Sequence, residues 1–246
     1  MPGLDWLTAR PIAHRGLHDA SIVENTASAF NAAIAGGYGI ECDVQASADG
    51  EAMVHHDDAL DRLTEGNGRL AALPAAALKK LRFKQTADRM LTLGELCDLT
   101  GARTPLLIEI KSRFDGERTL VSRVAEVLAD YRGPVAAMSF DPAPVETLRH
   151  IAPGLTRGIV AERHYAHHEW DRMSQAQKWR LAFLFHASAT RPQFVAYGIR
   201  DLPALAPLAA RSLFGLPLLT WTVRTEAERR RAAHWADQVI FEGWRP

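Results

Sequence analysis

The stretch PLLIEIK (residues 105–111) is a short apolar run that ends in two charged residues, Glu109 and Lys111. A run of this length that is rich in Leu and Ile and bounded by proline is typical of a buried β-strand. Seven further strand-length runs lie at residues 11–13, 38–44, 135–140, 155–160, 193–197, 217–223 and 238–242. The chain is therefore expected to contain eight strands.

Amphipathic stretches separate most of these runs and predict helices. They cover residues 25–36, 91–100, 117–131, 142–151, 169–187, 202–214 and 225–236. The segment LAFLFHA (181–187) has a strand-like composition, but it continues the preceding periodic run without a breaker, so we expect it to end the helix over 169–187. Strands that alternate with helices predict an α/β fold with a parallel sheet, most simply closed into a (β/α)₈ TIM barrel.

One region departs from this alternation. Residues 46–90 contain no clear strand–helix unit, and we expect them to form a small insertion after the second strand that opens with a hairpin around ADGEAMVHHDD (48–58). The 246 residues contain no internal repeat, low-complexity tract or linker. We therefore expect a single barrel domain over residues 1–246.

Composition narrows the classes of function and location. The 29 basic and 29 acidic residues give a formal net charge of zero, and no basic stripe favours a nucleic-acid partner. The two cysteines have no metal-ligand spacing and indicate a reducing compartment without a disulfide framework. The N-terminal residues 1–10 contain no apolar core of signal-peptide length, and no run of 18 apolar residues occurs. Unless a leader has been removed, we therefore expect a cytoplasmic protein without stable membrane insertion. The sequence leaves the oligomeric state open.

Carboxylates occupy strand positions where packing alone would favour Val, Ile or Leu. Glu41 and Asp43 lie two residues apart, so both project to the same side of the second strand, whereas Cys42 points toward the helices. Glu109 and Lys111 share this spacing in the third strand. Buried charges without partners cost several kcal/mol each. Three carboxylates gathered in one barrel therefore predict a hard divalent cation such as Mg²⁺ or Ca²⁺, with Mn²⁺ as a further option.

Seven short motifs resemble those of one enzyme family. They are HRG (14–16), ENT (24–26), ECDV (41–44), ADG followed by VHHDDALDRLT (48–64), IEIK (108–111), SFDP (139–142) and WTVR (221–224). Together and in this order, they resemble the glycerophosphodiester phosphodiesterases, which are TIM barrels. HRG alone would be a weak signal, but the combined set is highly specific and runs over nearly the whole chain.

The resemblance implies a role for each matching residue. His14 and His56 correspond to the catalytic acid/base pair, and Arg15 and Lys111 to groups beside the phosphate. Trp221 corresponds to an aromatic wall beside the substrate. The metal ligands that the resemblance implies are Glu41, Asp43 and Glu109.

The residue chemistry agrees with these implied roles. A phosphodiester carries negative charge, and phosphoryl transfer spreads further charge over its oxygens, which Arg15, Lys111 and a divalent cation can stabilise. The attacking hydroxyl loses a proton while the leaving alkoxide gains one, and two histidines can carry out both transfers. His14 and Arg15 therefore end the first strand in order to face a phosphate. The expected partner is a small-molecule glycerophosphodiester.

Two alternatives stay open beside hydrolysis to an alcohol and sn-glycerol 3-phosphate. One is a phospholipase-type phosphodiesterase that acts on a phospholipid head group through a cyclic phosphate. The absence of an evident amphipathic membrane-binding stretch or exposed aromatic loop disfavours that reading. The other is a non-catalytic barrel that binds phosphodiesters or a protein partner. That reading is disfavoured because none of the motif histidines and carboxylates is missing.

The remaining histidines are expected to have no catalytic role. His55 would face away from His56 along an extended segment. His18 is expected on the loop surface, with contact to the rim of the pocket as the alternative. His164, His167 and His168 share one loop after the fifth predicted strand, but they lack carboxylate or cysteine partners at a metal-binding spacing. A solvated loop that could contact the alcohol portion of the substrate is the favoured interpretation of that segment.

Three further positions are notable. Asn25 is expected to cap the first helix, and the preceding Glu24 is close enough in sequence to reach the site. The family usually ends its last strand in Thr-Asp, whereas this chain reads QVIFEGW (238–244). Glu242 is a candidate to take over the local role of those residues.

Overall fold

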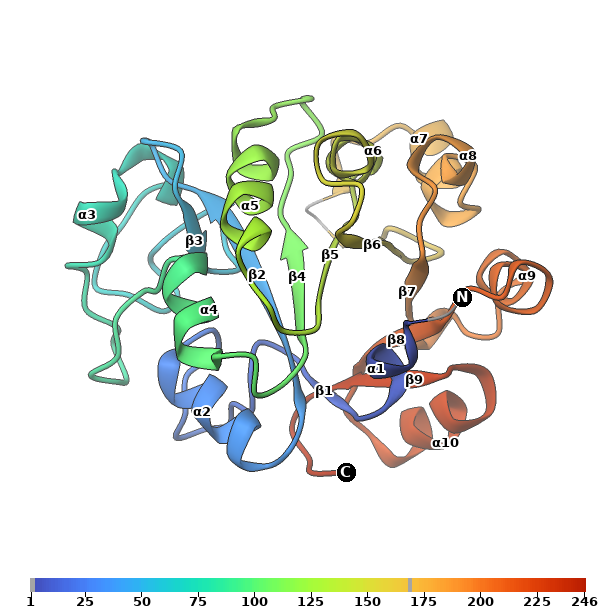
Figure 1. Cartoon of the computed structure of the whole chain (residues 1–246), viewed down its shortest axis with the longest axis horizontal. Helices are drawn as coiled ribbons and strands as arrows, with labels where there is room; N and C mark the ends of the chain where they lie inside the picture. The colour runs from blue at the N-terminus through green and yellow to red at the C-terminus, as the bar shows by residue number, and fades with distance from the viewer. Residues whose placement is uncertain (1–2, 168–169) are drawn as a thin grey trace.

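The computed structural model describes residues 3–167 and 170–246, and within them eight parallel strands close into a barrel surrounded by helices (Figure 1). The barrel strands are β1 (Ile12–Ala13), β2 (Gly39–Ala46), β4 (Leu106–Ile110), β5 (Val135–Ser139), β6 (Thr156–Ala161), β7 (Phe194–Gly198), β8 (Leu218–Val223) and β9 (Gln238–Phe241). The barrel closes because β1 pairs in parallel with both β2 and β9. The predicted (β/α)₈ barrel is confirmed.

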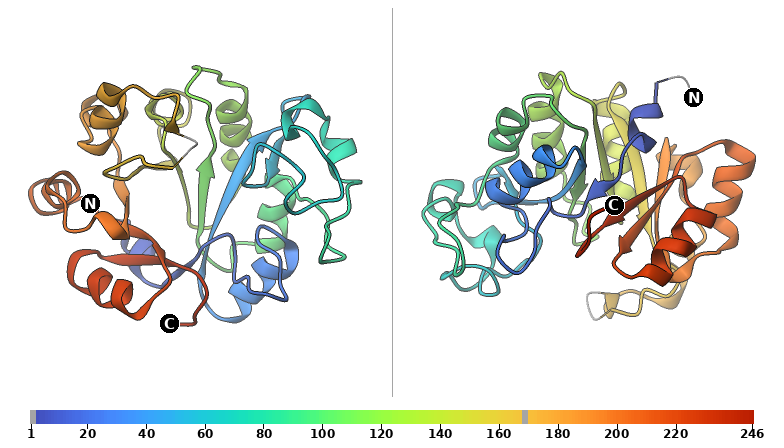
Figure 2. Two further views of the ribbon diagram at one scale, coloured as in Figure 1. Left: turned by 180° about the vertical axis from the view of Figure 1, so that it is seen from behind. Right: turned by 90° about the horizontal axis from the view of Figure 1, so that it is seen from below.

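Helices lie outside the ring of strands in all three ribbon views (Figures 1 and 2). The α-helices and 3₁₀ helices are α1 (Asp5–Thr8), α2 (Ala27–Ala35), η1 (Leu70–Ala72), α3 (Ala75–Leu78), α4 (Leu93–Thr100), α5 (Thr119–Ala129), α6 (Pro142–Ile151), α7 (Gln175–Ala182), α8 (Ala187–Thr190), η3 (Ile199–Asp201), α9 (Leu205–Phe214) and α10 (Glu226–Trp235). Local sequence sets several of their first turns. Thr92, Ser174 and Thr225 each form a capping box with the Glu or Gln three residues later.

The apolar side chains form an inner and an outer layer. The inner cluster fills the barrel and includes Leu107, Met138, Phe194 and Leu219, together with Leu7 from α1. The outer clusters lie between the strands and the surrounding helices. Cys42 is fully buried in the outer layer. Its neighbours Glu41 and Asp43 therefore face the barrel interior, as their spacing predicted.

The insertion after β2 opens with the predicted hairpin. The strand β3 (Ala52–Val54) pairs antiparallel with β2, with Val44 opposite Val54 and Ala46 opposite Ala52. The remainder, which contains η1 and α3, has a buried cluster of its own built on Met53, Leu60, Leu70, Leu78, Phe83 and Met90, with Val23. A hydrophobic cluster of this kind holds the hairpin end, which carries His56, against the barrel.

The prediction of a single long helix over residues 169–187 is wrong. Glu169 lies outside the described residues, and α7 begins after the N-cap Ser174 and ends at Ala182. Leu184 then takes a left-handed backbone conformation (φ 56°), and α8 starts a new turn at Ala187. The break lets Leu181 and Leu184 be buried while Phe183 and Phe185 stay exposed. An unbroken helical periodicity could not have produced that arrangement.

The N-cap of α2 is also corrected. Thr26, not Asn25, accepts the capping hydrogen bond from Ala29 N–H. Asn25 has a left-handed backbone conformation (φ 55°) and directs its side chain to Asp43 instead. In the described part of the chain, no helix combines the length and apolar character needed to cross a lipid bilayer.

The close approach of β6 to Phe194 gives a test of the barrel packing. A Cβ atom at Gly158 would lie 2.2 to 2.5 Å from three ring carbons of Phe194. We expect Gly158→Ala to lower the free energy of unfolding by about 1–3 kcal/mol, measured by urea denaturation. Adding Phe194→Leu should recover part of the loss. The control is Gly154→Ala, because a Cβ there meets nothing within 4 Å. Equal effects of the Gly158 and Gly154 substitutions would contradict this packing.

Candidate active site

Three carboxylates meet on the inner side of β2 and β4. Asp43 is the direct register partner of Glu109 across these parallel strands, and Glu41 lies two residues before Asp43 on the same side. One oxygen of each carboxylate lies within 4.8 Å of the others. Glu41 and Asp43 are each only 1% exposed and Glu109 is 8% exposed. The structure therefore brings the three predicted metal ligands together.

Two cations balance part of this buried negative charge. The Lys111 ammonium lies 2.8 Å from one oxygen of Asp43 and also hydrogen-bonds to Glu109. The Arg15 Nε lies 3.1 Å from the other Asp43 oxygen. Burial alone would raise the pKa of Asp43, but Lys111 and Arg15 outweigh it and hold that pKa well below its ordinary value. Asp43 is therefore ionised.

Glu41 is compensated less completely than Asp43. Its carboxylate accepts a hydrogen bond of 2.9 Å from the Arg15 backbone N–H. Burial raises the pKa of Glu41 well above its ordinary value, and the charges of Asp43 and Glu109 raise it further. Burial and the two neighbouring carboxylates thus disfavour the ionised form of Glu41. An additional cation bound here would stabilise that form. The all-oxygen donor set fits Mg²⁺, Mn²⁺ or Ca²⁺ better than Zn²⁺.

A chain of ion pairs links Arg15 to His56. Arg15 Nη1 donates to Glu24 at 2.7 Å, and the same Glu24 oxygen accepts from Arg62 Nη2 at 2.7 Å. Arg62 also pairs with Asp57, whose other oxygen lies 2.7 Å from His56 Nδ1. Burial would raise the pKa of Asp57, but hydrogen bonds from His56 and Arg62 hold it well below its ordinary value. The ionised carboxylate can only accept, so His56 Nδ1 carries the proton and Nε2 is left for the pocket.

His14 has an equivalent carboxylate partner at the opposite end of the sequence. His14 Nδ1 lies 2.9 Å from Glu242 Oε2, and the same oxygen accepts from Arg224 at 2.7 Å. Burial lowers the pKa of His14 from 6.5 to about 4, although Glu242 opposes this effect. Burial would raise the pKa of Glu242, but the hydrogen bonds from His14 and Arg224 hold it well below its ordinary value. A neutral imidazole thus donates Nδ1–H to an ionised carboxylate, and its Nε2 is an acceptor.

Both histidines lie within electrostatic reach of the same carboxylate cluster. The positive charges of His56 and His14, when protonated, each lower the pKa of Asp43, which puts both rings within electrostatic reach of it. His14 follows β1, and His56 follows the β3 strand of the insertion. The barrel and its insertion therefore converge on one site, although the two histidines lie 42 positions apart in the sequence.

Trp221 belongs to a row of aromatic side chains at the ends of several strands. Its indole N–H donates to the Ala196 carbonyl at 3.1 Å, which leaves the ring face for other contacts. Its ring meets Phe140 edge-on at 5.3 Å between centroids, and Phe140 packs on Trp170 at 5.0 Å. Trp170 comes from the segment after β6, which was expected to be a solvated loop able to contact the alcohol portion of the substrate. Tyr165 of that segment also packs on Trp170 at 5.3 Å.

Several residues near the site differ from expectation or were missed. Asn25 is buried and donates to Asp43 at 2.9 Å, so it acts on a carboxylate of the cluster. His18 lies at the rim of the site and not on the loop surface, because its side chain is only 15% exposed and lies 4.0 Å from Glu242. The roles of Arg62 and Arg224 as carboxylate partners had no signal apart from their places in the motifs. The only sequence signal for Glu242 was its departure from Thr-Asp.

The loop histidines give no metal group among the described residues. His164 and His167 are exposed, as expected for a solvated loop, and His164 lies 3.7 Å from Asp201. His168 lies outside the described residues. The candidate metal groups in the described chain are the Glu41, Asp43 and Glu109 cluster and the group His14, His18 and Glu242. Glu242 already binds His14 and Arg224, so the first group has the better donor set.

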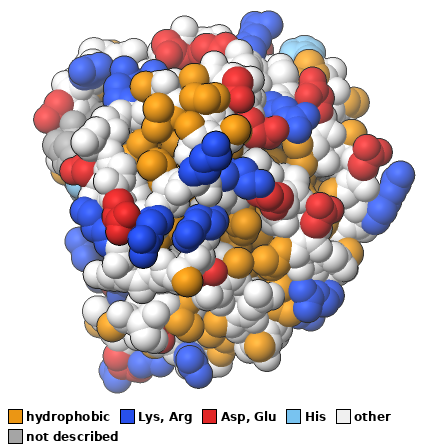
Figure 3. Space-filling model, turned by 90° about the vertical axis from the view of Figure 1, so that its left-hand side faces the viewer, with side chains coloured by type: hydrophobic (Ala, Val, Ile, Leu, Met, Phe, Trp, Pro, Cys, Tyr) orange, Lys and Arg blue, Asp and Glu red, His pale blue; other side chains and the backbone are white. Residues whose placement is uncertain are grey.

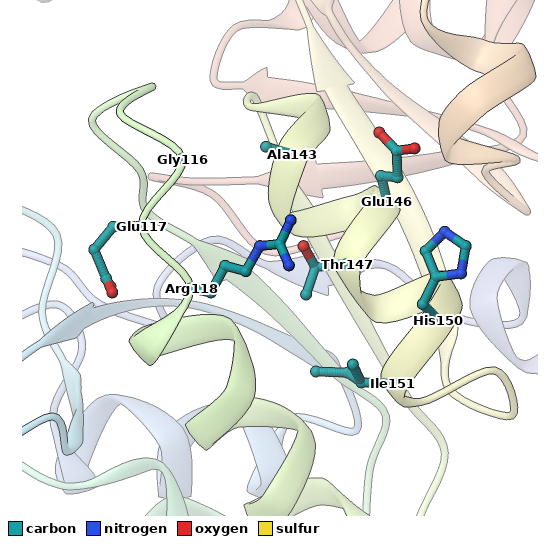
Figure 4. A pocket seen from close by; sticks show the side chains of 8 residues that line it. All are labelled: Gly116, Glu117, Arg118, Ala143, Glu146, Thr147, His150 and Ile151. Carbon is teal, nitrogen blue, oxygen red and sulfur yellow. The ribbon is translucent and has the colours of Figure 1, made fainter.

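A surface groove elsewhere does not contain this chemistry. It lies between the loop before α5 and the outer face of α6, where Arg118, Glu146 and His150 line it (Figure 4). None of the residues that line the groove belongs to the carboxylate cluster or to either histidine–carboxylate pair. The candidate active site is therefore the polar mouth of the barrel.

Known proteins with similar sequences match this chain over different lengths. Glycerophosphodiester phosphodiesterase of Caldanaerobacter subterraneus is 30% identical over 244 residues, which cover 94% of this chain and 93% of that protein. Human glycerophosphodiester phosphodiesterase 1 is 44% identical over 72 residues, which cover 28% of this chain and 21% of the human protein. The first match extends over both chains almost completely.

Solved structures agree at the level of the fold. A phosphodiesterase of Oleispira antarctica, solved with the product sn-glycerol-3-phosphate, superposes with a TM-score of 0.80 at 21% identity and covers 97% of this chain and 95% of that one. Glycerophosphodiester phosphodiesterase of Thermotoga maritima gives a TM-score of 0.70 at 24% identity, covering 94% and 92%. The sequence model of the Glycerophosphoryl diester phosphodiesterase family matches residues 14–243. This chain therefore belongs to the glycerophosphoryl diester phosphodiesterase family.

Proposed function

We propose that the protein hydrolyses glycerophosphodiesters to an alcohol and sn-glycerol 3-phosphate with the help of a divalent cation and two histidines. The observation that carries this proposal is the pair of histidines, each held through Nδ1 by an ionised carboxylate, beside a buried cluster of three carboxylates. The family match supports the reaction, and the product bound in the Oleispira antarctica structure supports the substrate class.

The cation would be held by Glu41, Asp43 and Glu109. When bound, a divalent cation supplies charge stabilisation to phosphoryl oxygens. Arg15 and Lys111 are the protein's own positive groups at this place, since both already contact Asp43. They would bind the phosphate oxygens and stabilise the charge that develops there. Mg²⁺ and Ca²⁺ are the favoured ions, and Mn²⁺ is an acceptable substitute.

The two histidines would move the protons. His14 is neutral and presents Nε2 as an acceptor, so it would remove the proton of the glycerol 2-hydroxyl as that oxygen attacks phosphorus. His56, protonated on Nε2, would give its proton to the departing alkoxide. The first step forms the new bond from the 2-oxygen to phosphorus and breaks the bond to the alcohol, giving a cyclic phosphate. Water then opens this ring, with the two histidines exchanging roles.

Trp221 and its aromatic neighbours would form one wall of the substrate site. The indole N–H is already bound to a backbone carbonyl, so the ring can offer substrate only its apolar face. Such a wall excludes water from one side of the reacting group. It would position the substrate, not take part in proton transfer.

Metal dependence is tested by chelation and by one ligand substitution. We expect EDTA to abolish activity and Mg²⁺, Mn²⁺ or Ca²⁺ to restore it at least in part. Glu41→Gln should weaken metal binding in calorimetric titration by roughly 10²-fold or more. In chelator at pH 7 the variant should be at least as stable as the wild type, because it loses a buried charge repelled by Asp43 and Glu109. Full activity in chelator would remove this part of the proposal.

The acid/base assignment is tested by two substrates. We expect His14→Ala and His56→Ala each to lower the rate on a glycerophosphodiester on the order of 10²–10⁴-fold. A nitrophenyl ester has a leaving group that hardly needs protonation. His56→Ala should therefore spare the nitrophenyl substrate, whereas His14→Ala should damage both substrates alike. Equal losses on both substrates in both variants would contradict the assignment, even if each histidine proved essential.

The contact between Glu242 and His14 gives a test of how the base is positioned. Glu242→Gln should lower kcat by roughly 10²-fold, because the amide can donate to Nδ1 and favour the wrong tautomer. Combined with His14→Ala, it should cause almost no further loss, since the two residues act as one unit. The control is Glu228→Gln, because Glu228 accepts from the backbone N–H groups of Arg224 and Thr225 and has no contact with His14. Losses that simply add in the double variant would show that Glu242 does not act through His14.

A further inference from the structure

The segment from Arg172 to Arg200 has an unusual charge composition. In a chain with equal numbers of acidic and basic residues, these positions contain five Lys or Arg residues and no Asp or Glu. The segment forms α7 and α8 on the outside of the barrel, with the turn between them, and then the barrel strand β7 (Figure 1). It follows directly on the loop that brings Trp170 to the barrel mouth.

Three large aromatic side chains are exposed within this segment. Trp179 is 60% exposed, Phe183 44% and Phe185 70%. Trp179 and Phe183 are four residues apart, so they are neighbours on one face of the helix end. The left-handed Leu184 then turns the chain so that Phe185 stacks on Phe183, with ring centroids 5.8 Å apart and planes at 18°. We refer to Trp179, Phe183 and Phe185 as the aromatic surface.

Uncompensated positive charge accompanies the aromatic surface. Arg180 lies three residues before Phe183 on the helix and is exposed, as are Arg172 and Arg191. None of these three arginines forms an ion pair with a carboxylate among the described residues. This contrasts with the side of the molecule formed by α3 and the insertion, where basic and acidic side chains are interspersed (Figure 3). There, for example, Lys79 pairs with Glu95.

We infer that the aromatic surface and Arg180 dock on the anionic surface of a lipid bilayer. Aromatic rings beside unpaired basic groups favour the interface between lipid head groups and acyl chains. Each Lys or Arg near an anionic bilayer adds to the attraction, within the reach allowed by salt. A second copy of this chain fits less well, because a two-fold interface would place the same acid-free segment against itself. The expectation from the sequence that no exposed aromatic stretch exists is wrong for this segment.

Docking of this kind is peripheral and does not require a membrane-spanning helix. The aromatic surface begins in α7, one short loop away from Trp170, and Trp170 packs through Phe140 toward Trp221 at the site. The inference does not depend on the proposed catalytic roles, because none of its residues touches the carboxylate cluster or the two histidines. Its test can therefore fail or succeed separately from the tests of catalysis.

The test is vesicle binding of the whole protein. We expect co-sedimentation with vesicles of phosphatidylglycerol and phosphatidylcholine at low salt, weaker binding at high salt, and little binding to phosphatidylcholine alone. Phe185→Ala should weaken binding roughly tenfold through lost apolar burial. Arg180→Glu should weaken it at least about fivefold, the effect of losing one basic group. Leu213→Ala on α9 is the matched control, because Leu213 is 77% exposed outside the segment and its loss should leave binding unchanged.

Two further measurements report whether Trp179 reaches the acyl chains and whether the variants are folded. Brominated acyl chains should quench the fluorescence of the wild type, and Trp179→Phe should bind nearly as well but lose most of that quenching. Activity on a soluble glycerophosphodiester should be unchanged in all four variants, which shows that they fold. Failure of the wild type to bind anionic vesicles, or equal losses in Leu213→Ala and Phe185→Ala, would overturn the inference. Self-association that Phe185→Ala abolishes, or binding to nucleic acid instead of vesicles, would also overturn it.

Discussion

The buried repulsion among Glu41, Asp43 and Glu109 is the constraint on which the rest of the site depends. Parallel pairing of β2 with β4 puts Asp43 beside Glu109, and the two-residue spacing adds Glu41 on the same side. Three carboxylates in such a place would destabilise the barrel without positive charge nearby. Lys111, Arg15 and the expected cation supply that charge. The positive charges that offset the repulsion within the cluster are also the groups suited to binding a phosphodiester.

A second feature is the likeness of the two histidine environments. His14 and His56 come from different elements, yet each holds a carboxylate at Nδ1, and each carboxylate is in turn held by an arginine. Fixing Nδ1 leaves Nε2 of both rings available for proton transfer. The two rings differ in burial, since the His14 side chain is 12% exposed and the His56 side chain 21%. Burial keeps His14 neutral, which suits a base in the first step.

Much of the fold and of the site could be predicted from the sequence, because the pattern of apolar and charged side chains along each strand is a local property. Short apolar runs located the barrel strands, and a period of two put Glu41 and Asp43 on one side. The break after α7 could not be predicted, since it depends on which of Phe183, Leu184 and Phe185 the barrel buries. The pairing of His14 with Glu242 brings the two ends of the chain together, and only closure of β1 on β9 makes that contact possible. The exposure of the aromatic surface could not be predicted either, because it depends on the same choice of which side chains are buried.

We expect the carboxylate cluster of β2 and β4 to hold the functional cation. The most direct measurement is anomalous X-ray scattering from crystals of the protein soaked in Mn²⁺. We predict one strong peak within about 2.6 Å of oxygens from Glu41, Asp43 and Glu109. A peak at His14, His18 and Glu242 with none at the carboxylates would contradict it, because the metal would then occupy the place assigned to the catalytic base.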